Sequence, residues 1–255
     1  MSRLDPRLLL QCYAAGIFPM ADSRDAAELF WVEPRTRAIM PLDHFHLSRS
    51  LRRIVRSGRF QLTLDRAFAR VIRACANRDE TWINEEIESA MLTLHASGHA
   101  HSIEVWHSGE AGQKLVGGLY GVRLGRAFFG ESMFSTMTDA SKVALAWLVA
   151  RLKVGGFTLL DCQFMTDHLA SLGAVSVSRA DYIALLSGAL GGGSTGAATA
   201  PLLGSGGGMT APASAGTSAA PPDFLALDRL LDATGAAGEP GPAGYVIAQL
   251  LGQTS

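Results

Sequence analysis

The spacing of apolar residues changes near residue 100, and this change constrains the fold more than any other feature of the chain. Between residues 48 and 98, apolar side chains recur every three or four positions, as on one face of a helix. Residues 101–135 instead alternate as strands do, in the runs HSIEVWH, KLVGGLYGVRL and RAFFGESMFS. Helical spacing returns after Thr138, and the short apolar run FTLLDCQF then predicts a buried strand. The chain therefore combines packed helices with a sheet.

Polar residues mark where the predicted helices begin. Ser48, Asp65 and Asn84 are each placed to cap a helix, because their side-chain oxygens accept hydrogen bonds from backbone N–H groups of the first turn. The first of these helices is expected to end at Gly58 and the third at Gly98, since glycine commonly follows the last helical turn.

Basic side chains are concentrated in one part of a nearly neutral chain. The chain carries 22 Lys and Arg against 23 Asp and Glu, yet residues 49–78 hold nine arginines and a single acidic residue, Asp65. That segment has a net charge of +8, and the remainder has −9. On a helical period the arginines lie opposite the apolar faces in two stripes, which are Arg49, Arg52, Arg53 and Arg56, and Arg66, Arg70 and Arg73. Such stripes are either phosphate-binding surfaces or ordinary solvated faces, and the spacing leaves both interpretations open.

The cysteines and the apolar runs indicate where the protein works. Cys12, Cys75 and Cys162 are far apart and leave an odd thiol, which is no disulfide framework and favours a reducing cytoplasm. No run in the sequence reaches the about 20 apolar residues that cross a membrane. The first 20 residues resemble a signal peptide, but Asp5 and Gln11 interrupt that pattern and argue against export.

Two further patterns are weak indications of a bound group. His95, His99, His101 and Glu104 have the side chains that hold metals, but Gly98 breaks the helix between the first two. Residues 101 and 104 also point to opposite faces of a strand. The glycine-rich run GGLYG lacks the Lys and Ser or Thr of a phosphate-binding loop. We therefore expect neither a metal nor a nucleotide cofactor.

Polar residues interrupt two apolar strands. Glu131 lies within RAFFGESMFS, and Asp161 and Gln163 lie within FTLLDCQF. Alternation along a strand puts Asp161 and Gln163 on one face, with Cys162 on the other. Buried acids are costly unless they are paired or functional. These residues are therefore a candidate site, with a structural ion pair or helix cap as the alternative.

Ten runs of the sequence occur in a characteristic order between residues 10 and 185. They are YAAGIFPM, WVEPRTRAI, FHLSRSLRR, TWI, LHASGHAHSIEVW, LVGGLYGV, GESMFS, ASKVAL, DCQ and HLASLGA. In this order they closely resemble the bacterial leucyl/phenylalanyl-tRNA–protein transferases. The chain departs from the family at Val32 and Glu33, where many members have an aromatic and a small polar residue, and at Arg35 and Thr36, which replace Asp-Pro.

The resemblance implies an α+β fold. A small N-terminal domain, residues 1–45, would sit on a catalytic domain, residues 46–187, that is like the acyl-CoA N-acyltransferases, with a mixed sheet and flanking helices. Residues 188–222 are rich in Gly, Ala, Ser and Pro and are interpreted as a flexible linker. Residues 223–255 contain short amphipathic pieces that can dock on the core.

The activity implied by the resemblance is transfer of Leu or Phe, and less well Met, from aminoacyl-tRNA to an acceptor protein with N-terminal Arg or Lys, which marks that protein for degradation. An aminoacyl ester is already activated, so no cofactor is expected. We expect a cytoplasmic monomer with no membrane or DNA partner. A transferase with a cell-wall peptide as acceptor and a non-catalytic RNA-binding module are the alternatives.

The resemblance also assigns site residues. Glu131 would hold the amino group of the aminoacyl end, and Gln163 and Asp161 would orient the incoming amine and its proton. Trp31 and Trp82 would stack on the terminal adenosine, and the two arginine stripes would grip the tRNA acceptor stem. The apolar pocket for the Leu or Phe side chain would consist of Phe128, Met133, Leu145, Leu148, Leu152 and Leu160.

Overall fold

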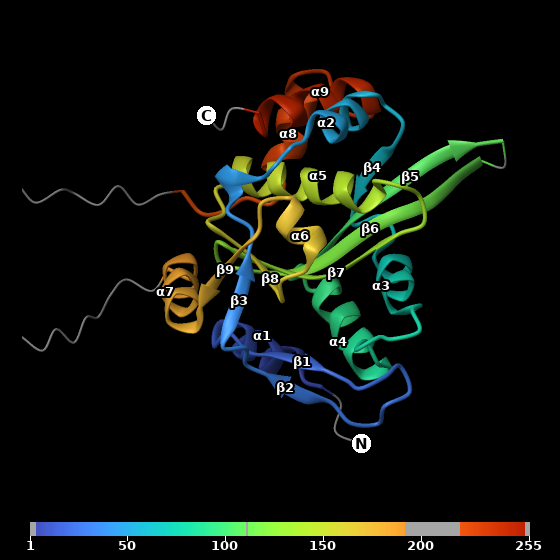
Figure 1. Cartoon of the computed structure of the whole chain (residues 1–255). Coiled ribbons are helices and arrows are strands. Elements are labelled where there is room, and N and C mark those ends of the chain that lie inside the picture. Colours follow the sequence, from blue (N-terminus) through green and yellow to red (C-terminus); the bar gives the residue numbers. More distant parts are fainter. Residues whose placement is uncertain (1–3, 111, 192–219, 253–255) are drawn as a thin grey trace, which may run out of the picture.

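A mixed sheet between two layers of helices organises the molecule (Figure 1). The computed structural model describes residues 4–110, 112–191 and 220–252. Within these residues the sheet has seven strands in the order β4-β5-β6-β7-β8-β3-β9. Their bounds, in that order, are Gln61–Leu64, Ala100–Gly109, Gly112–Leu124, Ala127–Ser135, Leu159–Gln163, Thr36–Ile39 and Val175–Ser178.

The sheet is antiparallel except at its centre. β5, β6 and β7 are the three strands that the alternating runs predict, and Gly125 forms the tight turn between the last two with φ of 54°. β7 and β8 are parallel neighbours. Because parallel strands need a crossover, helix α5 (Ala140–Val154) connects them across one face of the sheet.

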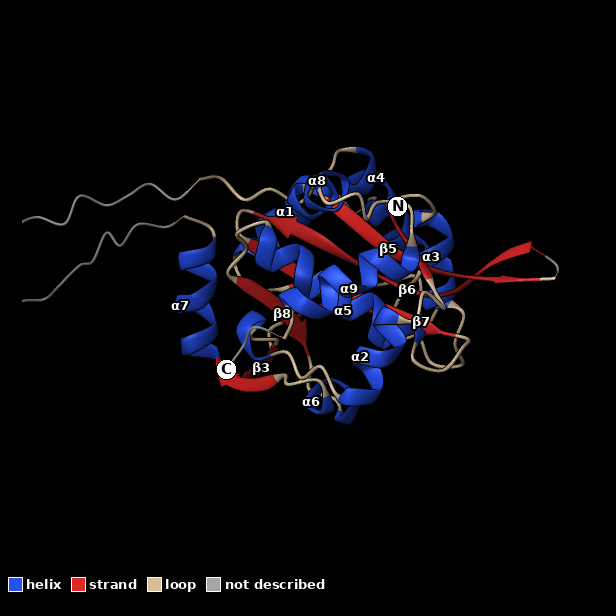
Figure 2. Ribbon diagram, turned by 90° about the horizontal axis from the view of Figure 1, so that it is seen from above, coloured by secondary structure: helices blue, strands red, loops and turns tan. Residues whose placement is uncertain are grey.

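The first helix layer lies on the face that α5 crosses (Figures 1 and 2). Beside α5 it contains α2 (Arg49–Arg56), α8 (Ala226–Ala233) and α9 (Pro240–Leu250). Leu51 of α2, Leu148 of α5 and Leu227 of α8 belong to one buried apolar cluster. The amphipathic patterns of these segments therefore bury a common face.

The second helix layer lies on the opposite face of the sheet. It contains α1 (Pro6–Ala14), α3 (Phe68–Ala76), α4 (Glu85–Ala96) and α7 (Arg179–Ala189). Tyr13, Ile72 and Met91 belong to a second apolar cluster, separate from the first. A small antiparallel hairpin, β1 (Phe18–Met20) with β2 (Phe30–Val32), lies next to α1.

The N-terminal and catalytic parts share the main sheet. β3 lies within residues 1–45, which the sequence assigned to a separate domain, yet Ala38 of this strand pairs with Gln163 of β8 and Ser176 of β9. The predicted boundary at residue 45 therefore does not match the strand pairing, because the extended backbone of β3 satisfies its hydrogen bonds in the main sheet. The expected α+β fold, a mixed sheet flanked by helices, is confirmed.

The predicted helix caps have different outcomes. Ser48 and Asn84 cap α2 and α4 as predicted, each accepting a hydrogen bond from the backbone N–H three residues on. The prediction for Asp65 is wrong. α3 begins at Phe68 without a side-chain cap, and Asp65 instead accepts a hydrogen bond of 2.8 Å from the backbone N–H of Ser102 on β5. A partner on a neighbouring strand thus replaces the local cap.

Residues 223–252 contain α8 and α9 of the first helix layer, which pack against α5 and α2. The ring of Phe224 is buried and stacks on Phe128 of β7, with 5.5 Å between ring centroids. The guanidinium of Arg151 on α5 donates to the Phe224 carbonyl and to the Asp228 carboxylate, both at 2.6 Å. Much of the predicted linker, residues 192–219, lies outside the described residues. Among the described residues, two short helical turns remain, η1 (Leu42–His44) and α6 (Asp167–Ser171).

Candidate active site

An apolar cavity of about 250 Å³ lies between the centre of the sheet and helices α5 and α6. Its apolar lining includes Leu119, Met133, Leu145, Leu148, Leu160 and Leu169. Glu131 and Gln163 provide polar groups in the same lining. A concave, mostly apolar space with few polar groups is the usual form of a small-ligand site.

The cavity contains most of the side chains predicted to form the apolar pocket. Met133, Leu145, Leu148 and Leu160 line it. Phe128 and Leu152 instead lie behind its wall, fully buried in the first apolar cluster. Phe128 is covered by Phe224 of the C-terminal segment, and Leu152 lies one helical turn beyond Leu148 on α5.

A β-bulge turns Glu131 into the cavity. Tyr120 of β6 pairs with Ser132, and the adjacent Gly121 pairs with Gly130, so Glu131 is the extra residue of the bulge. Bulges re-aim side chains and are frequent beside active sites. As a result four consecutive residues, 130 to 133, line the cavity, which regular strand alternation does not permit.

The carboxyl group of Glu131 is buried and titrates near neutral pH. Burial raises its pKa to about 8, and the charge of Asp161 adds to the rise, whereas the neighbouring Tyr13 hydroxyl and the charge of Arg37 oppose it. Its Oε1 accepts a hydrogen bond of 2.8 Å from Nε2 of Gln163. Within the described residues, its Oε2 has no hydrogen-bond partner of good geometry. Glu131 also interacts with the Tyr13 hydroxyl, so Oε2 is a buried acceptor rather than an atom exposed to the cavity.

Gln163 ends β8 in a conformation that breaks strand alternation. Its φ is 62°, in the left-handed region that few residues other than glycine adopt, and its backbone N–H donates to Oδ1 of Asp161 at 2.8 Å. The sequence placed Asp161 and Gln163 on one face with Cys162 opposite. In the structure Cys162 joins Gln163 in the cavity lining, and Asp161 lies outside that lining.

Asp161 forms a buried ion pair on the side of the N-terminal part. Nε and Nη2 of Arg37 donate to its two oxygens at 2.9 and 2.6 Å, and the Tyr182 hydroxyl donates to Oδ2 at 2.9 Å. The guanidinium of Arg37 lies between the rings of Phe18 and Tyr182, 4.5 and 4.6 Å from their centroids. Both partners of the ion pair are at most 2% exposed. Asp161 therefore holds Gln163 through its backbone N–H rather than lining the cavity.

No pattern in the sequence pointed to Tyr13, Arg37 or Tyr182 as part of this site. Tyr13 begins the run YAAGIFPM and Arg37 lies in WVEPRTRAI, so both fall within runs that carry the family resemblance. Arg37 and Asp161 are 124 positions apart, and neither spacing nor periodicity relates them.

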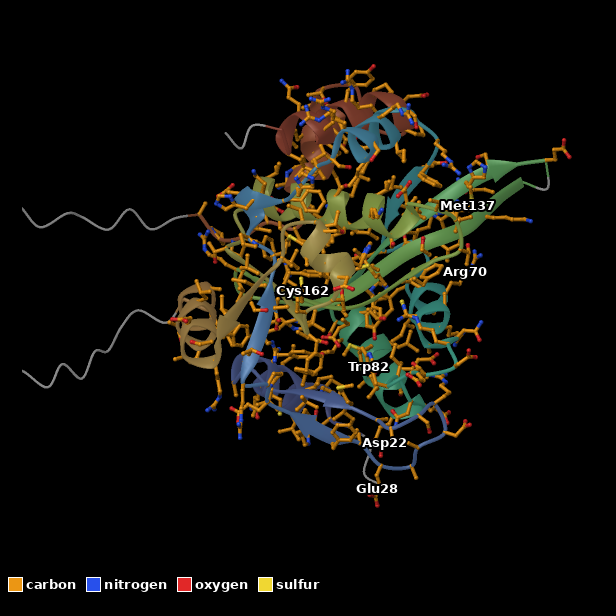
Figure 3. The ribbon with its side chains drawn as sticks, viewed as in Figure 1. Asp22, Glu28, Arg70, Trp82, Met137 and Cys162 are labelled. Atoms are coloured by element: carbon orange, nitrogen blue, oxygen red, sulfur yellow. The ribbon has the colours of Figure 1, made fainter. Side chains whose placement is uncertain are left out.

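The mouth of the cavity is aromatic. Trp82 lines it, and its carbonyl accepts a hydrogen bond of 3.1 Å from the backbone N–H of Ala21, which ties the loop after β1 to the mouth (Figure 3). Trp31, the other tryptophan predicted to stack on adenosine, is half-exposed on β2 and lies outside the cavity lining. Phe164 lines the mouth and packs edge-to-face on Phe18.

The two arginine stripes lie in different helix layers. α2 packs into the first apolar cluster and α3 into the second, so the stripes are on opposite faces of the sheet (Figure 1). On α2, Arg56 lies over the ring of Tyr245 of α9, 4.0 Å from its centroid. On α3, Nε of Arg73 donates to Glu88 at 2.8 Å. None of the stripe arginines lines the cavity.

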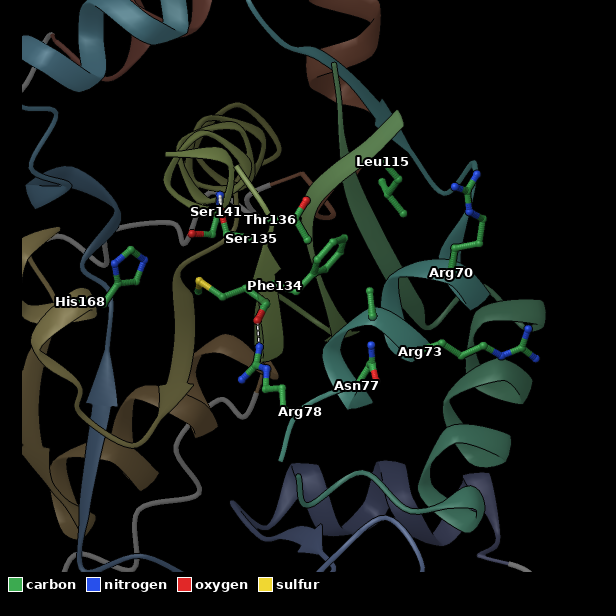
Figure 4. Close-up of a pocket in the computed structure, with 12 residues that line it drawn as sticks. Arg70, Arg73, Asn77, Arg78, Leu115, Phe134, Ser135, Thr136, Ser141 and His168 are labelled. Atoms are coloured by element: carbon green, nitrogen blue, oxygen red, sulfur yellow. Dashed lines mark hydrogen bonds between the residues drawn. The ribbon is translucent and has the colours of Figure 1, made fainter. Parts of the chain in front are cut away.

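An open groove of about 750 Å³ adjoins the cavity on the side of α3 (Figure 4). Groove and cavity share Arg78, Met133 and His168 in their linings. Arg78 donates a hydrogen bond from Nη2 to the Met133 carbonyl, drawn as a dashed line in Figure 4. Burial, and to a smaller extent the charge of Lys142, lowers the pKa of His168, so its imidazole is neutral at pH 7.

The side chains with metal-ligand spacing are engaged locally. Nδ1 of His101 lies 2.7 Å from Asp65, and Nδ1 of His95 lies 2.9 Å from a backbone carbonyl. Glu104 accepts a hydrogen bond of 2.5 Å from the Ser102 hydroxyl. Across the described ranges, no three His, Cys, Asp or Glu side chains come together as a metal site. None of the helices described there is long and apolar enough to span a bilayer.

Comparison with known proteins assigns the chain to a family. A family model described as leucyl/phenylalanyl-tRNA protein transferase matches residues 39–187, and a model of that family's N-terminal domain matches residues 2–35. A leucyl/phenylalanyl-tRNA–protein transferase of Rhizorhabdus wittichii is 58% identical over 266 residues, covering 100% of both chains. One from Zymomonas mobilis is 60% identical over 191 residues, covering 73% of this chain and 70% of its own.

Among solved structures, that of FemX aligns with a TM-score of 0.47 at 12% identity, covering 67% of this chain and 66% of FemX. The family models and the relatives together define the class: the chain is an aminoacyltransferase. It belongs to the leucyl/phenylalanyl-tRNA protein transferase family, which confirms the resemblance seen in its sequence.

Proposed function

We propose that this enzyme transfers Leu or Phe, and less efficiently Met, from aminoacyl-tRNA to the N-terminal Arg or Lys of acceptor proteins, and so directs them to degradation. The observation that carries the proposal is a cavity whose apolar wall meets a buried carboxyl–amide pair, Glu131 and Gln163. An aminoacyl group has two corresponding parts, an apolar side chain and an amino group. The names of the relatives support the same donor.

The apolar wall would select the side chain of the donor. Leu145, Leu148 and Leu160 present hydrocarbon surface to a space of about 250 Å³. A charged side chain placed there would lose its hydration without gaining a partner, at a cost of about 1–3 kcal/mol or more. A hydrophobic pocket discriminates weakly between apolar side chains, which is consistent with more than one donor.

Glu131 would bind the amino group of the donor. Its pKa of about 8 means that the empty site holds mainly the neutral acid at pH 7. An ammonium group beside it favours the carboxylate, because an opposite charge within a few ångströms lowers the pKa of an acid. The amino group would pair with the Glu131 carboxylate, while its Oε1 remains bonded to Gln163.

Gln163 would orient the amine of the acceptor. Its Nε2 is engaged by Glu131, which directs the amide and leaves Oε1 as an acceptor for an amine N–H. The amine nitrogen bonds to the ester carbonyl carbon as the ester bond to the ribose breaks. Because an amide does not titrate, the proton would pass to the leaving ribose oxygen through the neighbouring hydroxyl or water. Alignment of amine and ester would supply most of the rate enhancement.

Asp161 would act through Gln163. The sequence suggested direct contact with the amine, but both carboxylate oxygens are occupied by Arg37, Tyr182 and the Gln163 backbone. We therefore assign Asp161 a positioning role. It would hold Gln163 in its left-handed conformation, which turns the amide toward Glu131.

Trp82 would stack on the terminal adenosine, and the arginines of both stripes would contact the tRNA backbone without reading its sequence.

A positively charged acceptor terminus would approach from the β1–β2 loop, where Asp22, Asp25 and Glu28 are exposed (Figure 3). Both substrates belong to the cytoplasm, which is the proposed location.

The acceptor separates this function from its alternative. Purified enzyme would be incubated with labelled leucyl-tRNA and one of three peptides: Arg-starting, the same peptide with an acetylated N-terminus, or a cell-wall peptide. We expect label on the Arg-starting peptide alone. Label on the cell-wall peptide alone would establish the alternative transferase. Binding of leucyl-tRNA without transfer to any peptide would establish a non-catalytic RNA-binding protein.

A further inference from the structure

We propose that the groove beside the cavity binds the phosphates of the single-stranded 3′ end of the donor tRNA, and that Arg78 contacts the phosphate nearest the ester. This inference rests on the proposed function, which requires the aminoacyl end to enter the cavity. It adds the path by which the preceding nucleotides reach that point (Figure 4).

The groove and the cavity are continuous. Arg78, Met133 and His168 line both spaces, so a chain whose last unit occupies the cavity can extend directly into the groove. The cavity, at about 250 Å³, is sized for an aminoacyl group, whereas the groove, at about 750 Å³, is larger and open. A large groove that runs into a smaller cavity suits a flexible strand with a terminal group.

The α3 side of the groove presents a row of cationic and amide side chains. Arg70, Arg73 and Asn77 are spaced three and four residues apart along α3 and its C-cap, so they share one side of the helix. Arg78 follows at the junction with the cavity. The guanidiniums of Arg70 and Arg73 are exposed, and planar guanidinium forks match phosphate geometry. Nε of Arg73 is bonded to Glu88, so Arg73 would contact a phosphate through its Nη groups.

Arg78 is held in place before any ligand binds. Its Nη2 donates to the carbonyl of Met133, two residues from Glu131 on the same strand. This bond orients the guanidinium at the mouth of the cavity and leaves its other N–H groups for a phosphate. A side chain held in its binding geometry loses less entropy when the ligand arrives.

The charges of the groove favour an anionic strand over a basic peptide. Among its lining residues in the described part of the chain there is no Asp or Glu, so a cationic acceptor terminus would be repelled. The opposite wall presents Ser135, Thr136 and Ser141, whose hydroxyls and backbone can contact sugars without distinguishing bases. Contacts of this kind serve all donor tRNAs alike.

Three donors separate phosphate contacts from contacts to the aminoacyl group. They are leucyl-tRNA, the leucylated trinucleotide CpCpA, and leucyl-adenosine, which has no phosphate. Arg78→Gln should lower kcat/KM about tenfold for the two phosphate-containing donors, as expected for loss of a charged hydrogen bond. It should leave leucyl-adenosine unchanged within about twofold. Arg229→Gln, an exposed arginine on α8, is the matched control and should change none of the three.

Binding of uncharged CpCpA gives a second readout that needs no transfer. For a single strand, the slope of log affinity against log salt falls by about 0.7 for each phosphate contact removed, and we expect this change in Arg78→Gln and Arg70→Gln. An equal loss with leucyl-adenosine, an unchanged salt slope, or displacement of CpCpA by an acidic peptide at equal concentration would each overturn the proposal. The proposed function alone would be refuted if wild-type protein had the steeper salt dependence of CpCpA binding expected relative to Arg78→Gln but transferred no Leu.

Discussion

The side-chain amide of Gln163 donates a 2.8 Å hydrogen bond to the carboxyl group of Glu131, although the two residues are 32 positions apart. They meet because β7 and β8 are parallel neighbours joined by the α5 crossover. Each also departs from regular strand geometry, Glu131 through a bulge and Gln163 through a positive φ. Two local irregularities thus bring an acid and an amide to the same edge of an apolar cavity.

Removing the amide should impair transfer without impairing donor binding. In Gln163→Ala the acceptor amine loses its orienting group, and we expect kcat to fall about a hundredfold, as when one preorganised polar group is removed from other active sites. The Kd for leucyl-tRNA, measured by filter binding, should stay within about twofold. Full turnover with normal tRNA affinity would remove Gln163 from the mechanism.

The acid of Glu131 should make stability depend on pH. Its pKa is about 8 in the folded protein and near 4.5 when exposed, so the folded state holds this proton more tightly. The resulting stabilisation is complete below pH 4.5 and is lost as the pH rises through 8, when a buried charge forms. The amide side chain in Glu131→Gln does not titrate, so this variant lacks the contribution of Glu131 to the pH dependence of stability.

The melting temperature of Glu131→Gln relative to wild type should therefore increase between pH 6 and pH 9, by the equivalent of about 3 kcal/mol, since the wild type loses about 1.4 kcal/mol for each of the two pH units up to the Glu131 pKa of about 8. Calorimetry of both proteins at both pH values measures this difference. The titration of all other groups is common to the two proteins and therefore cancels. An equal difference in melting temperature between the two proteins at pH 6 and pH 9 would show that the Glu131 carboxyl group is not buried in this way.

The ion pair behind the cavity should be essential for stability. Asp161→Asn leaves the guanidinium of Arg37 buried without its counter-ion, and breaking such a pair costs about 3–5 kcal/mol. Urea unfolding measures the loss. The control is Glu33→Gln, which removes the partner of the exposed Arg179 and should cost less than about 1 kcal/mol. Similar losses of unfolding free energy in the two variants would contradict the burial of the Arg37–Asp161 pair.

The C-terminal segment should contribute to the stability of the whole chain. Phe224 is 2% exposed and packs on Phe128 and Phe157, so Phe224→Ala should lower the free energy of unfolding by about 3–5 kcal/mol. The neighbouring Leu225, 50% exposed, is the control, and its replacement by Ala should have little effect. Equal effects in chemical denaturation would mean that the segment does not dock as described.

Much of the fold could be predicted from local patterns. The period change near residue 100 located β5 to β7, and the polar residues before apolar runs located two of the three helix caps, Ser48 and Asn84. Asp65 failed as a cap because its partner, Ser102, lies on a strand that is distant in sequence. Local propensity does not encode such tertiary hydrogen bonds.

The site was only partly predictable, because some of its residues carry a local sequence signal and others do not. Polar interruptions of apolar strands pointed to Glu131 and Gln163, but alternation misplaced Cys162 because it assumes regular strands. The helical spacing of α5 predicted Leu145 and Leu148 in the cavity lining. Phe128 lies outside that lining and stacks on Phe224 of the C-terminal segment, a contact that the sequence did not predict. Arg37, with its counter-ion 124 positions away, had no local signal.

Donor selectivity tests the central claim most directly. Transfer to an Arg-starting peptide would be measured with a mixture of all aminoacyl-tRNAs, followed by identification of the new N-terminal residue by mass spectrometry. The cavity described here predicts Leu and Phe, with less Met, and no charged residue. Peptides extended by Asp, Glu, Lys or Arg in comparable yield, or no extension at all, would contradict an apolar aminoacyl site at Glu131 and Gln163.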